Sequence, residues 1–218
     1  MLAERIPVAR EGIPFIATAA LATVTSAQLG WEIPAAIAFL ITAFVLYFFR
    51  DPERVVPADD DAVVSPADGK VLEIAPASDP VLENVKRQRV SIFMNVFNCH
   101  VNRAPIAGVI DAISYREGSF ISANRDRAML ENEQCALLLR RDDGLECTVV
   151  QVAGLIARRI VCRAQIGDRL EKGERFGMIR FGSRLDVYLP PEVEFTVRPG
   201  ERVVAGQSII ARKGGRLP

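Results

Sequence analysis

A long apolar segment near the start of the chain limits what the protein can fold into more than any other feature. From Ile13 to Phe49 the only charged residue is Glu32. The segment divides near Gly30 into two arms of about 17 residues each, close to the lower limit for a helix that crosses a bilayer. We therefore predict that residues 1–50 form an apolar α-helical hairpin that either spans the membrane or lies shallowly in it. The alternative is a pair of helices buried inside a soluble protein.

Basic residues flank this segment at both ends. Arg5 and Arg10 precede it, and Arg50 and Arg54 follow it. Because Lys and Arg are retained on the cytoplasmic side of membrane segments, both ends of the hairpin and the following domain are expected there. The predicted location is the cytoplasmic face of the cell membrane. A signal peptide fits poorly, since the apolar region is too long and no clear cleavage site follows it.

Charge and composition exclude several classes of function. Lys plus Arg and Asp plus Glu each number 27 among the 218 residues, so the formal net charge is zero. No basic field is therefore available to hold nucleic acid, and we expect no such partner. The single histidine, His100, excludes a multi-histidine metal site, and we expect no bound metal. The four cysteines form no CxxC pair, which favours reduced thiols in a cytosolic domain.

After Arg50 the sequence changes character. Residues 51–61, which read DPERVVPADDD, have the acidic and proline-bearing composition of a linker. In residues 62–218, short apolar runs alternate with Gly, Pro and Asp, a pattern that favours a mainly β barrel or sandwich. Only Arg125–Gln134 reads as helical or irregular. Strands are expected at Lys70–Ile74, Val90–Phe93, Gly108–Tyr115, Ala136–Arg140, Glu146–Val152, Ile156–Arg163, Arg184–Tyr188, Glu194–Val197 and Ser208–Arg212.

Two glycine-containing segments, at residues 166–173 and 198–206, are similar to each other. Each has a Gly, an apolar residue three positions later and a second Gly three positions after that. Because glycine allows positive φ, this spacing suits a tight turn that leads into a strand. The segments resemble turns of biotinyl- and lipoyl-carrier barrels, which implies a barrel-like, lipoyl-carrier-like hybrid domain. Neither turn carries the lysine that such carriers modify, so the resemblance supports the fold more than a carrier function.

Two polar strings hold candidate catalytic residues. The string SPADGK at residues 65–70 contains Asp68, which could orient or accept a proton or could form an ordinary Asp-Gly turn. The string NVFNCHVNRAP at residues 95–105 contains His100 and Arg103. A lone histidine is more often structural than catalytic. The arginine could pair with a carboxylate or phosphate, or it could be a solvated surface charge.

A third string, RFGSRLDVYLP at residues 180–190, contains the pair Gly182–Ser183. By itself this pair suits a turn that leads into a strand. Asp68, His100 and Ser183 together supply one residue of each type for a serine hydrolase, although the string has no G-x-S-x-G motif.

These strings, with the apolar N-terminus and VAGLIARRIVC at residues 152–162, resemble the phosphatidylserine decarboxylase proenzymes, most closely the short bacterial and archaeal type. Matching strings follow the family's order from about Arg50 to Arg212. The resemblance implies a pyruvoyl-dependent enzyme of phospholipid biosynthesis that cuts its own chain at Gly182–Ser183. It also implies a pyruvoyl cofactor derived from Ser183, with no metal and no pyridoxal phosphate.

In the chemistry that the resemblance implies, the hydroxyl of Ser183 attacks the carbonyl of Gly182 to give an ester. Elimination and hydrolysis then leave a ketone at residue 183. This ketone forms a Schiff base with the amine of phosphatidylserine, accepts the electrons released with CO₂ and yields phosphatidylethanolamine. The cut produces a β chain, residues 1–182, and an α chain, residues 183–218, which are expected to stay together as a heterodimer.

The resemblance also assigns roles to the other candidate residues. His100 is the expected proton donor, and Asp68 matches an aspartate associated with self-cleavage. Family members often carry a second histidine three residues after the first, where this chain has Arg103, which cannot act as a base. Two possibilities stay open. Either His100 serves both maturation and decarboxylation, or Asp68 acts on Ser183 directly while Arg103 stabilises an oxyanion or contacts the headgroup.

Phosphatidylserine in the bilayer is thus the expected substrate, and the hairpin would hold the enzyme beside it. Members of the family commonly pair, so further dimerisation is possible. Two other classes of function remain as alternatives. One is a membrane-anchored, non-enzymatic adaptor barrel of the lipoyl type, and the other is a Ser-His-Asp hydrolase. Both predict an intact chain, whereas the proenzyme becomes two chains.

Overall fold

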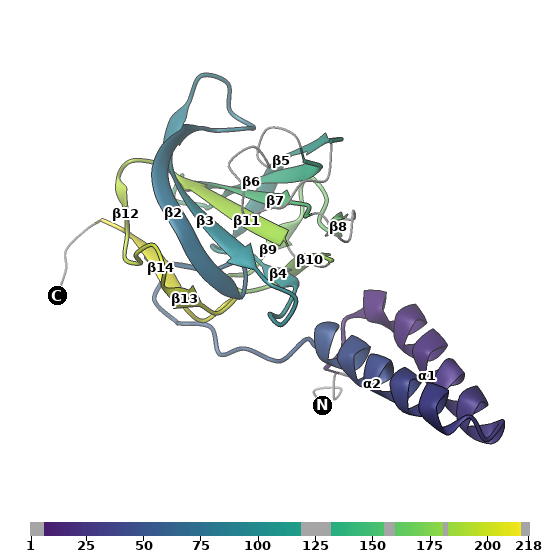
Figure 1. The fold of residues 1–218 in the computed structure, drawn as a ribbon. Coiled ribbons are helices and arrows are strands. Elements are labelled where there is room, and N and C mark those ends of the chain that lie inside the picture. Colours follow the sequence, from purple (N-terminus) through teal and green to yellow (C-terminus); the bar gives the residue numbers. More distant parts are fainter. Residues whose placement is uncertain (1–6, 119–131, 155–159, 181–182, 215–218) are drawn as a thin grey trace, which may run out of the picture. The chain divides into compact units, whose positions relative to one another are not determined.

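The computed structural model describes residues 7–118, 132–154, 160–180 and 183–214 (Figure 1). By the packing of its backbone the chain divides into two units, Met1–Glu53 and Arg54–Pro218. The first unit is helical, and the second is built from strands.

The first unit consists of two helices that run side by side in opposite directions (Figure 1). A short 3-10 helix, Arg10–Gly12, leads into α1 (Ile13–Gln28), and α2 follows at Glu32–Phe48. The hydroxyl oxygens of Thr23 and Thr42 lie 3.0 Å apart, so a polar contact joins the two helices.

Both helices expose large apolar side chains. No residue of α1 is buried, and large hydrophobic side chains on both helices are exposed, among them Leu21, Val24, Ile33, Phe39 and Leu40. No helix in the described part of the chain is both long and apolar enough to cross a membrane. The two helices therefore carry apolar surface that their mutual packing does not cover.

The second unit is organised around one eight-stranded antiparallel sheet that curls into a half-barrel (Figure 1). The strand order is β13-β2-β3-β11-β7-β6-β5-β9, so β11 lies between two strands that come much earlier in the chain. The bounds are β2 Gly69–Ser78, β3 Lys86–Met94, β5 Gly108–Arg116, β6 Gln134–Arg140, β7 Glu146–Val152, β9 Arg169–Leu170, β11 Ser183–Leu189 and β13 Arg202–Val203.

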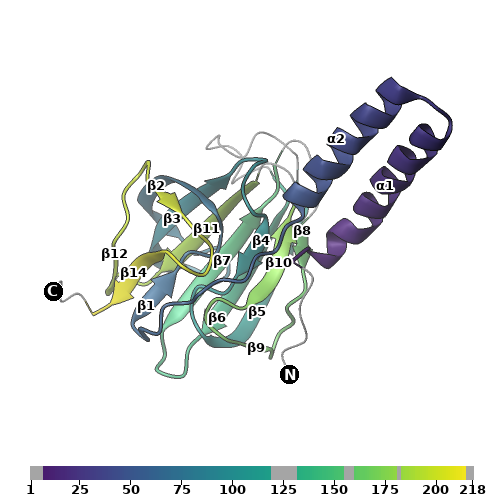
Figure 2. The ribbon, with the colours of Figure 1, turned by 90° about the horizontal axis from the view of Figure 1, so that it is seen from below.

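Two small sheets complete this unit (Figure 2). One has the order β1-β14-β12, and the other has the order β4-β10-β8. The bounds are β1 Ala62–Val64, β4 Val101–Arg103, β8 Ile160–Cys162, β10 Arg175–Ile179, β12 Val193–Phe195 and β14 Ile209–Lys213.

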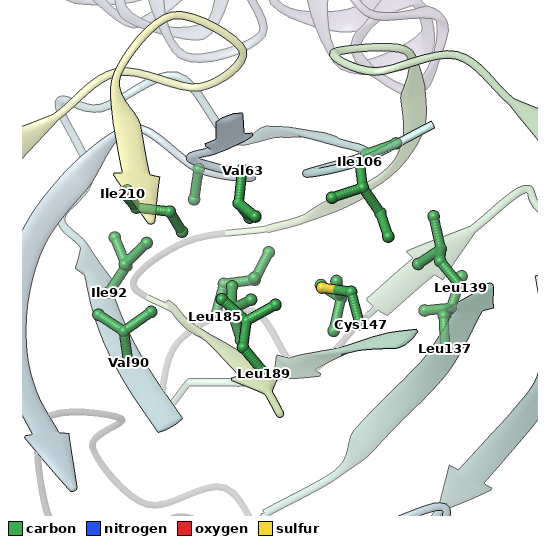
Figure 3. Close-up of a cluster of buried hydrophobic side chains, with 14 of the residues drawn as sticks. Val63, Val90, Ile92, Ile106, Leu137, Leu139, Cys147, Leu185, Leu189 and Ile210 are labelled. Carbon is green, nitrogen blue, oxygen red and sulfur yellow. The ribbon is translucent and has the colours of Figure 1, made fainter. Parts of the chain in front are cut away.

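The concave side of the large sheet holds the hydrophobic core (Figure 3). Alternate residues of a strand point to opposite faces, and on β11 the core-facing residues include Leu185 and Leu189. Side chains outside the large sheet, including Val63 of β1 and Ile210 of β14, point into the same cluster (Figure 3). Burial of these apolar groups stabilises the half-barrel and fixes which face of β11 is inside.

The prediction of a mainly β domain is confirmed. Every predicted strand overlaps an observed one, and β7 has the predicted bounds. The structure adds five short strands that the sequence analysis did not predict, namely β1, β4, β9, β10 and β13.

Two local predictions have different outcomes. The turn prediction for the similar glycine segments is confirmed, since Gly167 and Gly200 have φ of 91° and 95°. The segment Arg125–Gln134 lies mostly outside the described residues. Its last residue, Gln134, begins β6, so the prediction of a helical or irregular conformation is wrong at that position.

Candidate active site

Ser183 is the first residue of β11 and lies on the core face of the large sheet. It is opposite Met94 of β3, and Leu185, two positions further on, belongs to the hydrophobic core. The Ser183 side chain is fully buried, and its hydroxyl has no hydrogen-bond partner among the described residues. Leaving a buried hydroxyl unpaired costs about 1–3 kcal/mol, so this serine stands out. Gly182, the other half of the predicted cleavage site, lies outside the described residues.

Two buried amide side chains, one from the large sheet and one from a small sheet, meet on the core face of the large sheet. Gln151 of β7 is opposite Leu185, and its Nε2 donates a hydrogen bond to Oδ1 of Asn102 at 2.8 Å. Asn102 comes from β4 in a small sheet, and its Nδ2 contacts the sulfur of Met94 at 3.9 Å. This contact brings Asn102 to the residue opposite Ser183. The remaining amide oxygen of Gln151, Oε1, is buried and has no partner within the described ranges.

A glycine on β10 leaves room for the amide pair. Gly177 is paired with Asn102 on one side and with Cys162 on the other. A Cβ atom at this position would lie 3.1 Å from Nε2 of Gln151 and 2.4 Å from the carbonyl oxygen of Val161. Because the carbonyl oxygen of Val161 belongs to β8, the strand paired with β10, a larger residue at Gly177 would force these two strands apart.

His100 directly precedes β4 and is fully buried. Its Nδ1 lies 2.9 Å from the carbonyl oxygen of Asn98. Its own carbonyl oxygen accepts a hydrogen bond of 3.4 Å from the amide of Ile179. Ile179 ends β10, shortly before Ser183 in the chain. The backbone therefore places the only histidine beside the strand that leads to the candidate cleavage site.

The carboxylate of Asp68 is held by a cation and by a backbone amide. Nη2 of Arg54 donates to both carboxylate oxygens, at 3.2 and 2.9 Å, and the amide of Ala205 donates to Oδ1 at 2.8 Å. Asp68 thus joins Arg54 to the turn between β13 and β14. Since the Ser183 hydroxyl has no partner among the described residues, Asp68 does not contact it in this structure.

Arg103 is buried at the end of β4, so the alternative of a solvated surface charge is wrong. Its Nη1 donates to the carbonyl oxygen of Gly173 at 3.0 Å, and its amide donates to the carbonyl oxygen of Pro66 at 2.9 Å. A Cβ atom at Gly206 would lie 3.0 Å from the Arg103 side chain. Arg103 therefore packs between the two glycine turns and is tied to the loop that carries Asp68.

An ionic cluster lies on the opposite face of β11, directly beside Ser183. Nε of Arg184 donates to Oδ1 of Asp186 at 2.7 Å, and Nη2 donates to the hydroxyl of Ser91 at 2.8 Å. The same guanidinium reaches Glu73 of β2 at 3.4 Å. Arg184 and Asp186 are both buried. These contacts fix the first residues of β11 against β2 and β3.

Two cysteines from different sheets contact each other near the amide pair. Cys135 of β6 lies opposite Gln151, and its thiol forms a hydrogen bond with the thiol of Cys162 on β8. This hydrogen bond raises the pKa of Cys135 and lowers the pKa of Cys162 to about 7. Burial raises the pKa of Cys147. The four cysteines are free.

The structure brings Ser183 together with residues that the sequence analysis missed. Gln151 had one usable signal, because it is a polar residue at a position where the alternation of β7 predicts the core. Asn102 had no comparable signal, since only its contact with a distant strand gives it a place in the site. In the part of the chain that the structure describes, no group of three His, Cys, Asp or Glu side chains could hold a metal ion.

Comparison of the sequence with known proteins places the chain in a family. The family model of phosphatidylserine decarboxylase matches residues 41–211 of the chain. That range includes Asp68, His100, Arg103 and Ser183. The chain therefore belongs to the phosphatidylserine decarboxylase family.

Individual relatives align with nearly the whole length of the chain. Each of three is named phosphatidylserine decarboxylase proenzyme. The chain is 49% identical over 207 residues to the one from Geotalea daltonii, which covers 95% of this chain and 97% of the relative. It is 52% identical over 208 residues to the one from Nitratidesulfovibrio vulgaris, covering 95% of both chains. It is 50% identical over 212 residues to the one from Desulfotalea psychrophila, covering 97% and 99%.

Proposed function

We propose that the protein decarboxylates phosphatidylserine to phosphatidylethanolamine after it cuts its own chain between Gly182 and Ser183. The observation that carries this proposal is the Ser183 side chain, which is fully buried at the first position of a strand and has a hydroxyl with no partner in the described part of the chain. Family membership supports the same activity, and the relatives' name of proenzyme supports a maturation step.

The cleavage needs only the chain itself and water. Ser183 Oγ attacks the carbonyl carbon of Gly182, the peptide nitrogen leaves that carbon, and the hydroxyl proton passes to the nitrogen. Elimination then breaks the Cβ–O bond, so that Gly182 departs as a carboxylate and residue 183 becomes dehydroalanine. Tautomerisation and addition of water release ammonia and leave a ketone at residue 183. A serine hydroxyl is a weak nucleophile that a base must activate, and we propose His100 for this role; the imidazole does not contact the Ser183 hydroxyl in this structure and would have to approach it for the cleavage.

The site fits a pyruvoyl group at the start of the α chain. This group supplies an electron sink for decarboxylation. Residue 183 would hold it in an interior formed by Met94 opposite and by the amides of Asn102 and Gln151. The Ser183 hydroxyl, which has no partner among the described residues, supports this placement.

His100 is the proposed proton donor to the α-carbon of the serine headgroup after CO₂ has left. It is the only histidine, it is buried, and its backbone contacts the end of β10. Histidine suits this role because its charge changes near neutral pH. Asp68 and Arg103 are proposed to hold the loops around the site in place rather than to contact the reacting atoms. Arg103 ties the Asp68 loop to the glycine turns.

We also propose that residues 1–50 form a membrane-binding helical hairpin, that residues 51–61 are a linker, and that residues 62–218 form the catalytic domain on the cytoplasmic face. The exposed apolar side chains of α1 and α2 support this division. The positively charged flanks support the orientation. The glycine turns before β10 and β14 support a hybrid barrel with carrier-like features.

After cleavage the two chains are proposed to remain a heterodimer. In the described structure β11 is hydrogen-bonded to β3 on one side and to β7 on the other. The α chain would thus keep its first strand in the middle of a sheet formed by the β chain, with the Arg184 cluster holding its start.

The proposal is tested by CO₂ release from vesicles that contain phosphatidylserine labelled in the serine carboxylate. We expect the wild-type protein to release labelled CO₂ and to form phosphatidylethanolamine. Ser183→Ala should release none, because it has no hydroxyl to start the cleavage. Equal release by both proteins would overturn the role of Ser183, and no release by either would overturn the activity.

A further inference from the structure

Gln151 presents a buried hydrogen-bond acceptor on the face of the sheet that carries Ser183. Ser183 is opposite Met94, and Gln151 is opposite Leu185, the next core-facing residue of β11. Residues directly opposite each other, and residues two apart in one strand, share a face of the sheet. The register therefore places Ser183 and Gln151 on the same face of the sheet. They lie on the adjacent strands β11 and β7, and Gln151 is opposite the residue two positions after Ser183.

The Asn102 contact fixes which end of the Gln151 amide is available. Nε2 of Gln151 donates to Oδ1 of Asn102 at 2.8 Å, so the nitrogen is engaged and the oxygen Oε1 is presented. Gln151 is fully buried, and its Oε1 has no partner among the residues that the structure describes. Gly177 keeps space for this arrangement, since a Cβ there would lie 3.1 Å from Nε2. A buried amide oxygen without a donor is costly, so a donor from beyond the described residues is expected, and a bound ligand can supply it.

We propose that Gln151, oriented by Asn102, accepts a hydrogen bond from the amine of the lipid headgroup and so selects lipids with a primary amine. This inference rests on the proposed function, in which the headgroup amine must approach residue 183. A primary ammonium group has three N–H donors that can satisfy Oε1. A trimethylammonium group has none, so it would leave the buried oxygen unpaired. Sites that bind through a buried polar group reject ligands that lack its partner.

The test measures binding without the ketone, so that only non-covalent recognition contributes. The background is the full-length Ser183→Ala chain. The probes are dihexanoylphosphatidylethanolamine and dihexanoylphosphatidylcholine below their micelle concentrations, titrated by calorimetry. We expect the background protein to bind the ethanolamine lipid at least about tenfold more tightly than the choline lipid, as one hydrogen bond to a charged group allows.

Three further variants in that background separate recognition from stability. Gln151→Met removes the acceptor at similar volume and should reduce the preference to less than about threefold. Gln151→Glu keeps an oxygen acceptor and should retain it. The matched control is Thr148→Val, on the opposite face of the same strand, which loses a buried hydrogen bond of 2.7 Å to Asp79 and should leave the preference unchanged.

The outcomes distinguish this inference from the proposed function. An undiminished preference in Gln151→Met, or no preference in the background protein, overturns the role of Gln151. Loss of the preference in both Gln151→Glu and Thr148→Val would mean that the variants disturb the fold rather than the acceptor, and would also overturn it. The proposed function has its own test, which is whether the wild-type chain, with Ser183 in place, is cut.

Discussion

At the scale of single residues, the fold lowers the pKa of the Cys162 thiol. This thiol forms a hydrogen bond with the thiol of Cys135, which lowers the pKa of Cys162 to about 7. A lower pKa means more thiolate at a given pH, and the thiolate is the form that reacts with alkylating agents. Cys162 is only partly buried, whereas Cys147 is fully buried with a raised pKa.

We therefore expect Cys162 to be alkylated first by iodoacetamide, with a rate that rises through a midpoint near pH 7. Peptide mapping after short labelling between pH 6 and 9 measures this directly. In Cys135→Ala the midpoint should move up toward that of an ordinary thiol, about 8.5. An unchanged pH profile in Cys135→Ala would mean that the hydrogen bond does not set the reactivity.

A functional residue could be predicted from the sequence only where a short local motif contains it. Ser183 follows a glycine in a polar string, and His100 is the only histidine, so both were visible before the fold was known. Gln151 and Asn102 acquire their meaning from a contact between two sheets. No local pattern encodes a contact of that kind, because it depends on how distant strands pack.

At the scale of elements, the buried ion pair next to Ser183 fixes the start of β11. Arg184 and Asp186 are joined by a hydrogen bond of 2.7 Å and are almost fully buried. Removing one partner leaves the other charge buried without compensation, which costs about 3–5 kcal/mol. Replacing both partners by apolar residues removes the charges together and is expected to cost less.

We expect Arg184→Met to lower the free energy of unfolding by about 3–5 kcal/mol and the double change with Asp186→Leu to lower it by less. Urea unfolding in the Ser183→Ala background provides the measurement, since every variant is then compared as one chain. A single change that costs under about 1 kcal/mol would show that the pair does not hold β11. A double change that costs as much as the sum of both singles would show that the two charges do not interact.

The length of a strand decided whether it could be predicted from its own sequence. β7 was predicted with its observed bounds, because Glu146–Val152 is rich in β-branched residues and lies between turn signals. The two-residue strands β9 and β13 have no periodicity of their own. They exist because β5 and β2 offer them an edge to pair with, which is information from the fold rather than from the segment.

At the scale of the whole molecule, the exposed apolar side chains of α1 and α2 support the proposed attachment to a membrane. Val24 of α1 is 52% exposed, and Val55, in the second unit, is 82% exposed. The same change can therefore be made inside and outside the proposed membrane-binding surface. A glutamate is costly to place in an apolar membrane environment.

We expect Val24→Glu to weaken binding to phosphatidylserine-containing vesicles by about tenfold or more, and Val55→Glu to leave it nearly unchanged. Flotation of the full-length proteins with vesicles at physiological salt measures both. If the two variants lose binding equally, the loss comes from added negative charge, and the helices are not the attachment site.

The central claim is that the chain cuts itself at Ser183, and intact mass measurement of the purified wild-type protein and of Ser183→Ala tests it most directly. The account predicts two fragments for the wild type, of which the smaller, residues 183–218, has a mass of about 4 kDa and no free amine at its first residue. It predicts a single full-length chain for Ser183→Ala. A wild-type protein that stays at its full mass, both alone and after addition of phosphatidylserine vesicles, would contradict the account.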